Sequence, residues 1–177
     1  MLAGDLYLAD DPELVADARR SRELQDRYNT LGAGAVDERR EVLELLLGAI
    51  GPDTEIRAPF FCDYGAQIRI GARTFINVGL VALDVGLITI GDDVQIGPYV
   101  QLLTPTHPTD SEFRRQKWEA AEPITLGSNV WLGGGAIVLG GVTIGPNTVV
   151  GAGTVVTQDL PSDVVAVGNP ARIVRSL

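Results

Sequence analysis

Hydrophobic residues recur at every sixth position through the last third of the chain. The main series is Leu126, Leu132, Val138, Ile144, Val150 and Val156. Small or β-branched residues lie four positions after the first five of these, at Val130, Ala136, Val142, Thr148 and Thr154. A period of six matches neither an α-helix, with about 3.6 residues per turn, nor a simple alternating strand, with a period of about 2. It is the period of a parallel β-helix whose coils have hexapeptide sides.

The same spacing appears earlier in the chain in a less regular form. Its members are Ile56 and Cys62, then Ile70 and Ile76, then Ile90, Ile96 and Leu102. Steps of eight and fourteen residues separate these runs, so we expect the coil to begin near residue 55 and to contain small bulges. The period is then lost over residues 103–125, which are polar and charged. Such a long excursion from a compact scaffold is often functional.

Two helices are expected before the coil. Residues 11–28 begin with Asp11 as a capping residue and Pro12 at the first helical position. Residues 37–48 form a second amphipathic segment that ends at a glycine; its apolar residues are Val42, Leu43, Leu46 and Leu47. The predicted organisation is therefore a helical segment over 1–54, a β-helix over 55–160 with a loop at 103–125, and a closing segment over 161–177.

Composition narrows the class of protein. The chain of 177 residues has a formal net charge of −9, which argues against a nucleic acid or an anionic membrane as partner. Its single cysteine, Cys62, excludes an intrachain disulfide and is expected to be a small buried apolar residue. The first residues are acidic and lack the basic and apolar regions of a signal peptide, so a cytoplasmic location is expected.

The span 123–158 contains no charged residue and is long enough to cross a bilayer. It also contains nine glycines, and a lipid-facing helix of this composition would leave polar groups unpaired. Its period of six indicates coils of a β-helix instead. The absence of charge is consistent with a subunit interface or a ligand groove, where desolvating charges would be costly.

The loop contains the one histidine of the chain, in the sequence TPTHPTD over residues 104–110. Pro105 and Pro108 restrict the backbone on either side of His107. An imidazole with an ordinary pKa of about 6.5 is a natural general base. The alternative is an exposed loop histidine without a chemical role. Asp110 is expected to be a solvated loop residue.

Several blocks of sequence, in one order, resemble a known family. They are AGDLYLADDPEL, PFFCDYGAQIRIG, FINVGLVALD, THP, PITLGSNVWLGGGAIVLGGVTIG, VVGAGTVVTQDLP and VAVGNPARIVR. Together they cover nearly the whole chain, which resembles the sugar O-acetyltransferases of the maltose/galactoside acetyltransferase and nodulation protein L group. The resemblance implies a mainly β, left-handed parallel β-helix, an exception to right-handed crossovers. It also implies a homotrimer with active sites between neighbouring coils, acetyl-CoA as donor, a sugar hydroxyl as acceptor, and no metal.

The resemblance assigns roles to acceptor-side residues. His107 matches the family's base, and Asn77 matches the asparagine that contacts the acceptor and helps to position the histidine. Asp84, in a less secure register, and the weaker matches Asp63 and Phe75 correspond to acceptor contacts. Asn77 alternatively turns a corner of the coil, and Asp84 alternatively is a solvated turn residue.

On the donor side, Gly134 matches the position that faces the thioester, where its N–H would stabilise the oxyanion. Trp131 would pack along the pantetheine arm, with a subunit-interface aromatic as the alternative. The positions that match the CoA-binding groove are Ala152, Thr157 and Gln158, followed by Arg172 and Arg175 near the nucleotide. Many relatives have lysine where this chain has Gln158. The two arginines would compensate for that loss, and their spacing places them on one side if the tail is helical.

Some alternatives stay open. The candidates for acceptor contacts near the N-terminus have no clear register; they are Asp10, Asp11, Arg19 and Arg20.

A γ-carbonic anhydrase is excluded because its zinc requires three histidines. A serine acetyltransferase would have an extended helical N-terminal domain and a second histidine. A xenobiotic acetyltransferase with a loop histidine remains the enzymatic alternative, and a non-catalytic trimeric scaffold is the alternative from another class.

Overall fold

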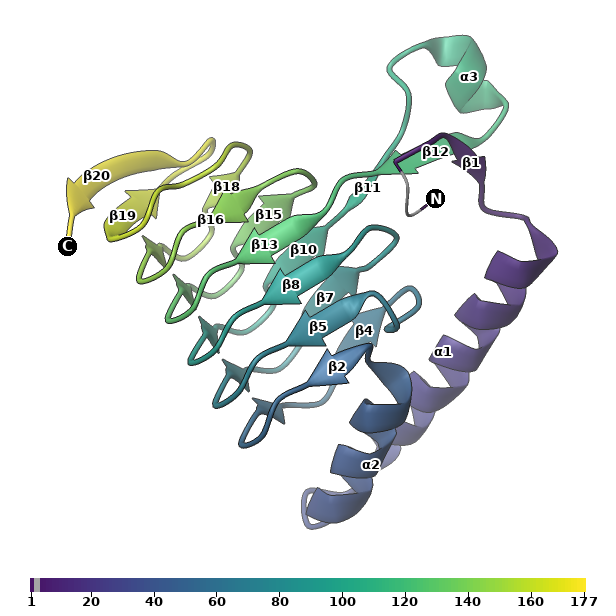
Figure 1. Ribbon diagram of the computed structural model, residues 1–177, viewed down its shortest axis with the longest axis horizontal. Helices are drawn as coiled ribbons and strands as arrows, with labels where there is room; N and C mark the ends of the chain where they lie inside the picture. The colour runs from purple at the N-terminus through teal and green to yellow at the C-terminus, as the bar shows by residue number, and fades with distance from the viewer. Residues whose placement is uncertain (2–3) are drawn as a thin grey trace.

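The computed structural model describes residue 1 and residues 4–177, so Ala3 of the first family block lies outside the described residues. The chain winds into a parallel β-helix with three faces, closed by helices at one end and by a hairpin at the other (Figure 1). The first face contains β2 (Ala49–Ile50), β5 (Ile68–Ile70), β8 (Ile88–Ile90), β13 (Ile124–Leu126) and β16 (Thr143–Ile144). The second face contains β3 (Glu55–Ile56), β6 (Phe75–Ile76), β9 (Gln95–Ile96), β14 (Trp131–Leu132), β17 (Val149–Val150), β19 (Val164–Val167) and β20 (Arg172–Ser176). The third face contains β4 (Phe60–Cys62), β7 (Leu80–Leu83), β10 (Gln101–Leu103), β15 (Ile137–Leu139) and β18 (Val155–Val156).

The period-six residues form the core, as predicted. Strand register stacks each inward side chain on the same position of the next coil, for example Ile76 on Ile96 and Leu132 on Val150. All six members of the main series are buried, as are the five residues of the second series. Ala82 occupies the inward position between Ile76 and Ile90 and is itself fully buried. The step of fourteen is therefore a step of six followed by one of eight.

The irregular steps all fall at one corner of the coil, where the third face turns into the first. Two successive coils have extra residues there, after Cys62 and after Ala82. The long excursion leaves the next coil at the same corner, between the end of β10 at Leu103 and the start of β13 at Ile124. The coil also begins earlier than predicted. Ala49 and Ile50 already pair with β5, in a strand of two residues that is too short to produce a period of its own.

A helical hairpin lies across the first coil (Figure 1). Helix α1 (Pro12–Thr30) begins where predicted, and the Asp11 side chain accepts the N–H of Glu13 at 2.9 Å. Helix α2 (Val36–Leu46) buries the predicted apolar residues Val42, Leu43, Leu46 and Leu47. Both helix predictions are confirmed to within about two residues at each end.

Side chains of the helical hairpin form hydrogen bonds with the open backbone edge of the first coil. Gln25 accepts from Cys62 N–H at 2.9 Å and donates to Cys62 C=O at 3.0 Å. One helical turn later, Asn29 makes the same two bonds with Phe60, at 2.9 and 3.0 Å. These amides take the place of a neighbouring strand beside β4. The Tyr28 hydroxyl donates to a carbonyl of β3, and the Arg40 guanidinium donates to Ile50 and Gly51 carbonyls at the edge of β2.

The closing segment ends in a strand and not a helix, so the helical condition attached to the spacing of Arg172 and Arg175 is not met. Strand β20 pairs antiparallel with β19, and the register shifts within the pair. Residues three apart on a regular strand point to opposite faces. The extra residue of the bulge cancels this, because Arg172 lies opposite Val167 and Arg175 lies opposite Val165, two positions on one face of β19. The two arginines therefore share a face for a different reason from the one expected.

None of the helices in the described part of the chain combines the length and the apolar character needed to cross a membrane.

Cys62 is buried as predicted, and burial raises the pKa of its thiol. Its side chain lies 3.7 Å from the Ser21 hydroxyl of α1.

Replacing Gln25 tests the cap of the coil. Gln25→Ala is expected to lower the free energy of unfolding by about 2–4 kcal/mol, because it leaves a buried N–H and C=O of Cys62 unpaired. Urea unfolding followed by circular dichroism, at one protein concentration, measures the change. Glu23→Ala, at an exposed position of the same helix, is the matched control and should change stability by less than about 0.5 kcal/mol. Equal effects of the two substitutions would contradict the role of the amide.

Candidate active site

The excursion that contains His107 is anchored by a small sheet of its own. Strand β11 (Pro105–Thr106) pairs antiparallel with β12 (Trp118–Ala121), and β12 pairs with β1 (Tyr7–Leu8) from the N-terminal segment. A short helix, α3 (Ser111–Arg115), lies between β11 and β12. The excursion is therefore a strand–helix–strand unit attached to the chain's N-terminus (Figure 1).

His107 follows β11 directly and is exposed. The β11–β12 ladder fixes the backbone up to Thr106, which lies opposite Ala120. Asp110, expected to be a solvated loop residue, is exposed but caps α3 by accepting from the N–H groups of Glu112 and Phe113 at 2.8 and 3.0 Å. The imidazole thus projects from a segment with defined backbone structure on both sides.

Asp84 has a different environment from the one expected. Its carboxylate is fully buried and accepts the N–H groups of Asp63, Tyr64 and Gln67 at 3.0, 2.8 and 3.2 Å. These bonds hold the corner of the preceding coil. Neither a solvated turn residue nor a carboxylate open to an acceptor fits a side chain with no exposed surface. Burial raises the pKa of Asp84, and the backbone N–H groups oppose that rise.

Asp63, by contrast, is only half-buried and belongs to a group of acidic and phenolic side chains beside the excursion. Burial, and then the charges of Asp84 and Glu119, raise the pKa of Asp63 to about 6. The Tyr7 hydroxyl donates to Glu119 at 2.7 Å, and burial and this bond raise the pKa of Tyr7. Tyr64, whose pKa is raised chiefly by burial, completes the group. Glu119 and Tyr7 were not predicted, because only the β1–β12 register brings them together.

A second set of candidates lies at the corner between the second and third faces. Asn77, Gly134 and Ala152 occupy this corner on different coils, and the Asn77 carboxamide accepts the N–H of Val78 at 2.8 Å. Asn77 therefore lies at a corner of the coil, where its side chain bonds to the next backbone N–H. The coils are closely stacked here: a Cβ on Gly133 would lie 2.4 Å from the backbone nitrogen of Ala152. Among the described residues, no backbone carbonyl accepts the N–H of Gly134, which is consistent with a free donor.

Trp131 and Phe75 lie on the outer side of the second face. Register aligns them in one row, with Gln95 between them. Trp131 is 55% exposed and lines a shallow hollow with Asn129, Asn147 and Leu177. Phe75 is half-buried beneath the guanidinium of Arg57, which lies 5.1 Å from the ring centre.

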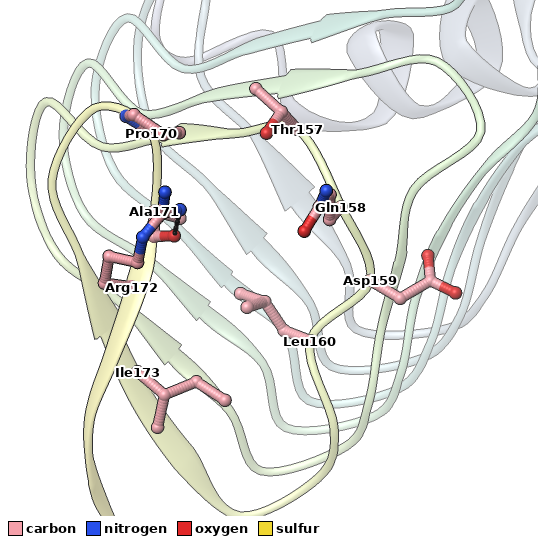
Figure 2. A pocket seen from close by; sticks show the side chains of 8 residues that line it. All are labelled: Thr157, Gln158, Asp159, Leu160, Pro170, Ala171, Arg172 and Ile173. Atoms are coloured by element: carbon pink, nitrogen blue, oxygen red, sulfur yellow. Dashed lines mark hydrogen bonds between the residues drawn. The ribbon is translucent and has the colours of Figure 1, made fainter.

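A groove of about 370 Å³ lies between the last coil and the C-terminal strand (Figure 2). It is lined by Thr157, Gln158, Asp159, Leu160, Pro170, Ala171, Arg172 and Ile173. Thr157, Gln158 and Arg172 are therefore brought together as expected. Arg172 is the one cation among these lining residues, and the Asp159 carboxylate accepts the N–H of Thr143 at 2.7 Å.

The N-terminal candidates have separate positions. Asp10 and Asp11 line a hollow with Trp118 of the excursion. Arg20 donates to the Leu45 carbonyl at 2.9 Å and joins the two helices, while Arg19 is exposed. In the described part of the chain, no group of at least three His, Cys, Asp or Glu side chains is arranged to hold a metal ion.

The fold and these corners define a hexapeptide-repeat protein with a helical cap. Residues 1–51 match the family described as the maltose acetyltransferase hexapeptide capping motif, and residues 123–158 match the bacterial transferase hexapeptide family. Nodulation protein L of Rhizobium meliloti (strain 1021) is 46% identical over 98% of this chain and 94% of that protein.

Solved structures agree closely with the fold. A maltose O-acetyltransferase from Clostridium difficile 630 superposes with a TM-score of 0.98, is 39% identical, and covers 99% of this chain and 94% of its own. A hexapeptide-repeat acetyltransferase from Vibrio cholerae O1 biovar eltor, complexed with acetyl coenzyme A, has a TM-score of 0.94 and 40% identity over 100% and 96% of the two chains.

The chain belongs to the hexapeptide-repeat acetyltransferase family that has the maltose acetyltransferase capping motif. It is an acyltransferase, and its coil is the left-handed parallel β-helix that the resemblance implied.

The raised pKa of Asp63 predicts a pH dependence of stability. The folded state holds this proton more tightly than the unfolded chain, in which the ordinary value is 3.8. The stabilising contribution is therefore complete below about pH 4 and is lost as the pH rises through about 6. Asp63→Asn removes the titration. Above pH 6 it should be more stable than the native protein by on the order of 1 kcal/mol, a reduced figure because solvent still screens the carboxylate.

Thermal unfolding at pH 4 and pH 8 measures this difference. Asp26→Asn, on an exposed position of α1, is the control and should change neither value. A gain of equal size at both pH values would contradict the titration of Asp63.

Proposed function

We propose that the protein transfers the acetyl group of acetyl-CoA to a hydroxyl of a sugar, with His107 as the general base. The observation that carries this proposal is the position of His107, the one histidine of the chain, exposed at the end of a strand-anchored excursion. Membership of the acetyltransferase family and the relatives named for maltose O-acetyl transfer and nodulation support it.

The chemistry requires a base, an oxyanion donor and alignment of the two substrates. In the proposed step the acceptor oxygen attacks the thioester carbonyl while its proton moves to the imidazole of His107. The carbon–sulfur bond then breaks, and the coenzyme A sulfur leaves and receives the proton that His107 took up, which returns the imidazole to its neutral form. The N–H of Gly134 would stabilise the negative charge that develops on the carbonyl oxygen, consistent with its lack of a carbonyl partner among the described residues.

Acetyl-CoA would extend from the corner at Gly134 toward the C-terminal strand. Trp131 and Ala152 would line the path of the pantetheine arm, and the nucleotide would reach the groove formed by Thr157 and Gln158. Arg172 lines that groove, and Arg175 shares its face of the closing hairpin. The two cations would compensate for the uncharged Gln158 near the phosphates of coenzyme A.

The acceptor would bind beside the excursion. Asp63 is partly open there, and carboxylates accept the hydroxyl hydrogen bonds by which sugars are recognised. Phe75 would add an aromatic surface from the second face, and Asn77 would add an amide from the corner that follows it. Asp84 would act indirectly, by holding the backbone of Asp63 and Tyr64.

We also propose a homotrimer in which neighbouring copies complete the site. Within one chain, the excursion with His107 leaves the coil at the corner between the third and first faces. Asn77 and Gly134 lie at the other edge of the third face. The outer side of this third face is largely apolar: Phe61 and Leu139 are 47% and 37% exposed, beside half-buried Val81 and Ile137. An exposed apolar surface of this kind favours contact with another subunit.

A cytoplasmic location remains a prediction.

Replacing the proposed base tests the function. His107→Ala is expected to lower kcat for acetyl transfer by about 10²–10⁴-fold, the contribution typical of a general base. The KM for acetyl-CoA and the thermal stability should not change, because His107 is exposed and lies outside the donor groove. Release of the coenzyme A thiol measures turnover, and Thr109→Ala on the same loop is the matched control. Near-normal turnover of His107→Ala would contradict the proposal.

The same thiol-release assay tests the acceptor class. Glucosides, galactosides, oligosaccharides and amino sugars would be compared with chloramphenicol-like alcohols, and mass spectrometry would locate the acetyl group. Turnover confined to the latter would favour the xenobiotic acetyltransferase. Absence of turnover with every acceptor would favour a non-catalytic scaffold.

The shared site can be tested separately. Sedimentation equilibrium is expected to give three times the chain mass of 18.8 kDa. Mixed refolding of His107→Ala with Gly134→Val should restore part of the activity that each variant lacks, because some clefts in mixed trimers would combine the two native residues. A stable monomer would refute the trimer, and an inactive mixture of folded trimers would refute the shared site.

A further inference from the structure

The segment that follows His107 is bound to helix α3 by one side chain. The Nη1 atom of Arg114 donates to the carbonyls of Pro108 and Thr109, both at 3.0 Å. One guanidinium nitrogen has two hydrogens, so both bonds can form together. They fix the carbonyl groups of the two residues that directly follow the proposed base.

Neighbouring hydrogen bonds close residues 108–114 into a compact loop. Asp110 caps α3 through the N–H groups of Glu112 and Phe113, and the Asp110 carbonyl accepts the Arg114 N–H at 3.1 Å. The Arg114 side chain then returns from the helix to residues 108 and 109. On its other side, His107 adjoins β11, which pairs with β12. The base is therefore held between a strand ladder and the Arg114 guanidinium.

Packing contributes little to holding this part of the excursion. Helix α3 has no buried residue, and Phe113 is 48% exposed. Apart from the restriction that Pro108 places on the backbone, hydrogen bonds must therefore hold the segment 107–110 in place. Exposed loops of this kind otherwise sample several backbone conformations.

We infer that Arg114 is a positioning residue that holds the His107 imidazole in line with the acceptor hydroxyl. This inference rests on the proposed function, because it acts only if His107 is the base. General-base catalysis requires the base within hydrogen-bond reach of the proton it removes, and small displacements are costly. The guanidinium suits the task because its planar fork presents several N–H donors in a fixed geometry.

Arg115 provides a matched control next to Arg114. It has the same side chain, lies on the same exposed helix, and pairs with Glu112 of its own helix instead of with the His107 segment. An exposed pair of this kind contributes little to stability. Comparing the two arginines therefore separates the bonds to Pro108 and Thr109 from a general effect of charge or helix content.

The expected result is a fall in kcat of about ten- to a hundred-fold for Arg114→Ala, the size associated with a displacement on the order of 1 Å. The KM for acetyl-CoA and the melting temperature should not change, because neither the groove nor the coil core includes α3. Arg115→Ala should retain full turnover. Arg114→Lys should recover part of the activity, because an ammonium group can donate to both carbonyls.

A double-mutant cycle with His107→Ala completes the test. If Arg114 acts through His107, Arg114→Ala causes no further loss in the His107→Ala background. Additive losses, or full turnover of Arg114→Ala while His107→Ala is inactive, overturn the positioning role and leave the proposed function intact. Near-normal turnover of His107→Ala overturns both.

Discussion

The parallel hydrogen bonds between successive coils are the constraint on which the rest of the structure depends. Each coil must present its N–H and C=O groups at the same height and spacing as the next, so the three faces tolerate almost no change in length. Extra residues are therefore confined to corners. Successive coils have them at the corner between the third and first faces. The excursion with His107 leaves the coil at this corner, the one place where the repeat accepts insertions.

A β-helix also has an open edge at each end, where backbone groups would meet solvent or another chain. At the first coil this edge is paired by Gln25, Asn29, Tyr28 and Arg40 of the helical hairpin. The last coil is closed by β20, which runs antiparallel to β19 and so ends the parallel stack. That closure also forms the groove around Arg172. The C-terminal hairpin that ends the coil therefore contributes to the proposed donor site.

The corner beside the excursion combines a rigid support with a titrating group. Asp84 is buried and satisfied by backbone N–H groups, so it fixes the chain around Asp63 and Tyr64. Asp63 keeps partial access to solvent, and burial together with the charges of Asp84 and Glu119 raises its pKa. Two aspartates that look alike in sequence thus differ in role because one side chain points into the corner and the other remains open. The excursion adds Glu119 to this corner, and the N-terminal strand β1, which pairs with β12, adds Tyr7.

The sequence by itself determined the coil, its core and the helices, because these depend on local periodicity and capping residues. Leu126 and its period-six successors could be assigned without coordinates, and His107 stood out as the one histidine in the break of that period. The sequence could not show that Asp84 is buried, that Ala82 completes the core, or that the tail is a strand whose bulge aligns Arg172 with Arg175. Only tertiary structure decided these points, because burial and strand register depend on contacts between residues distant along the chain. The bonds from Arg114 to the His107 segment belong to the same class: they depend on how α3 folds back, and no periodic pattern encodes that.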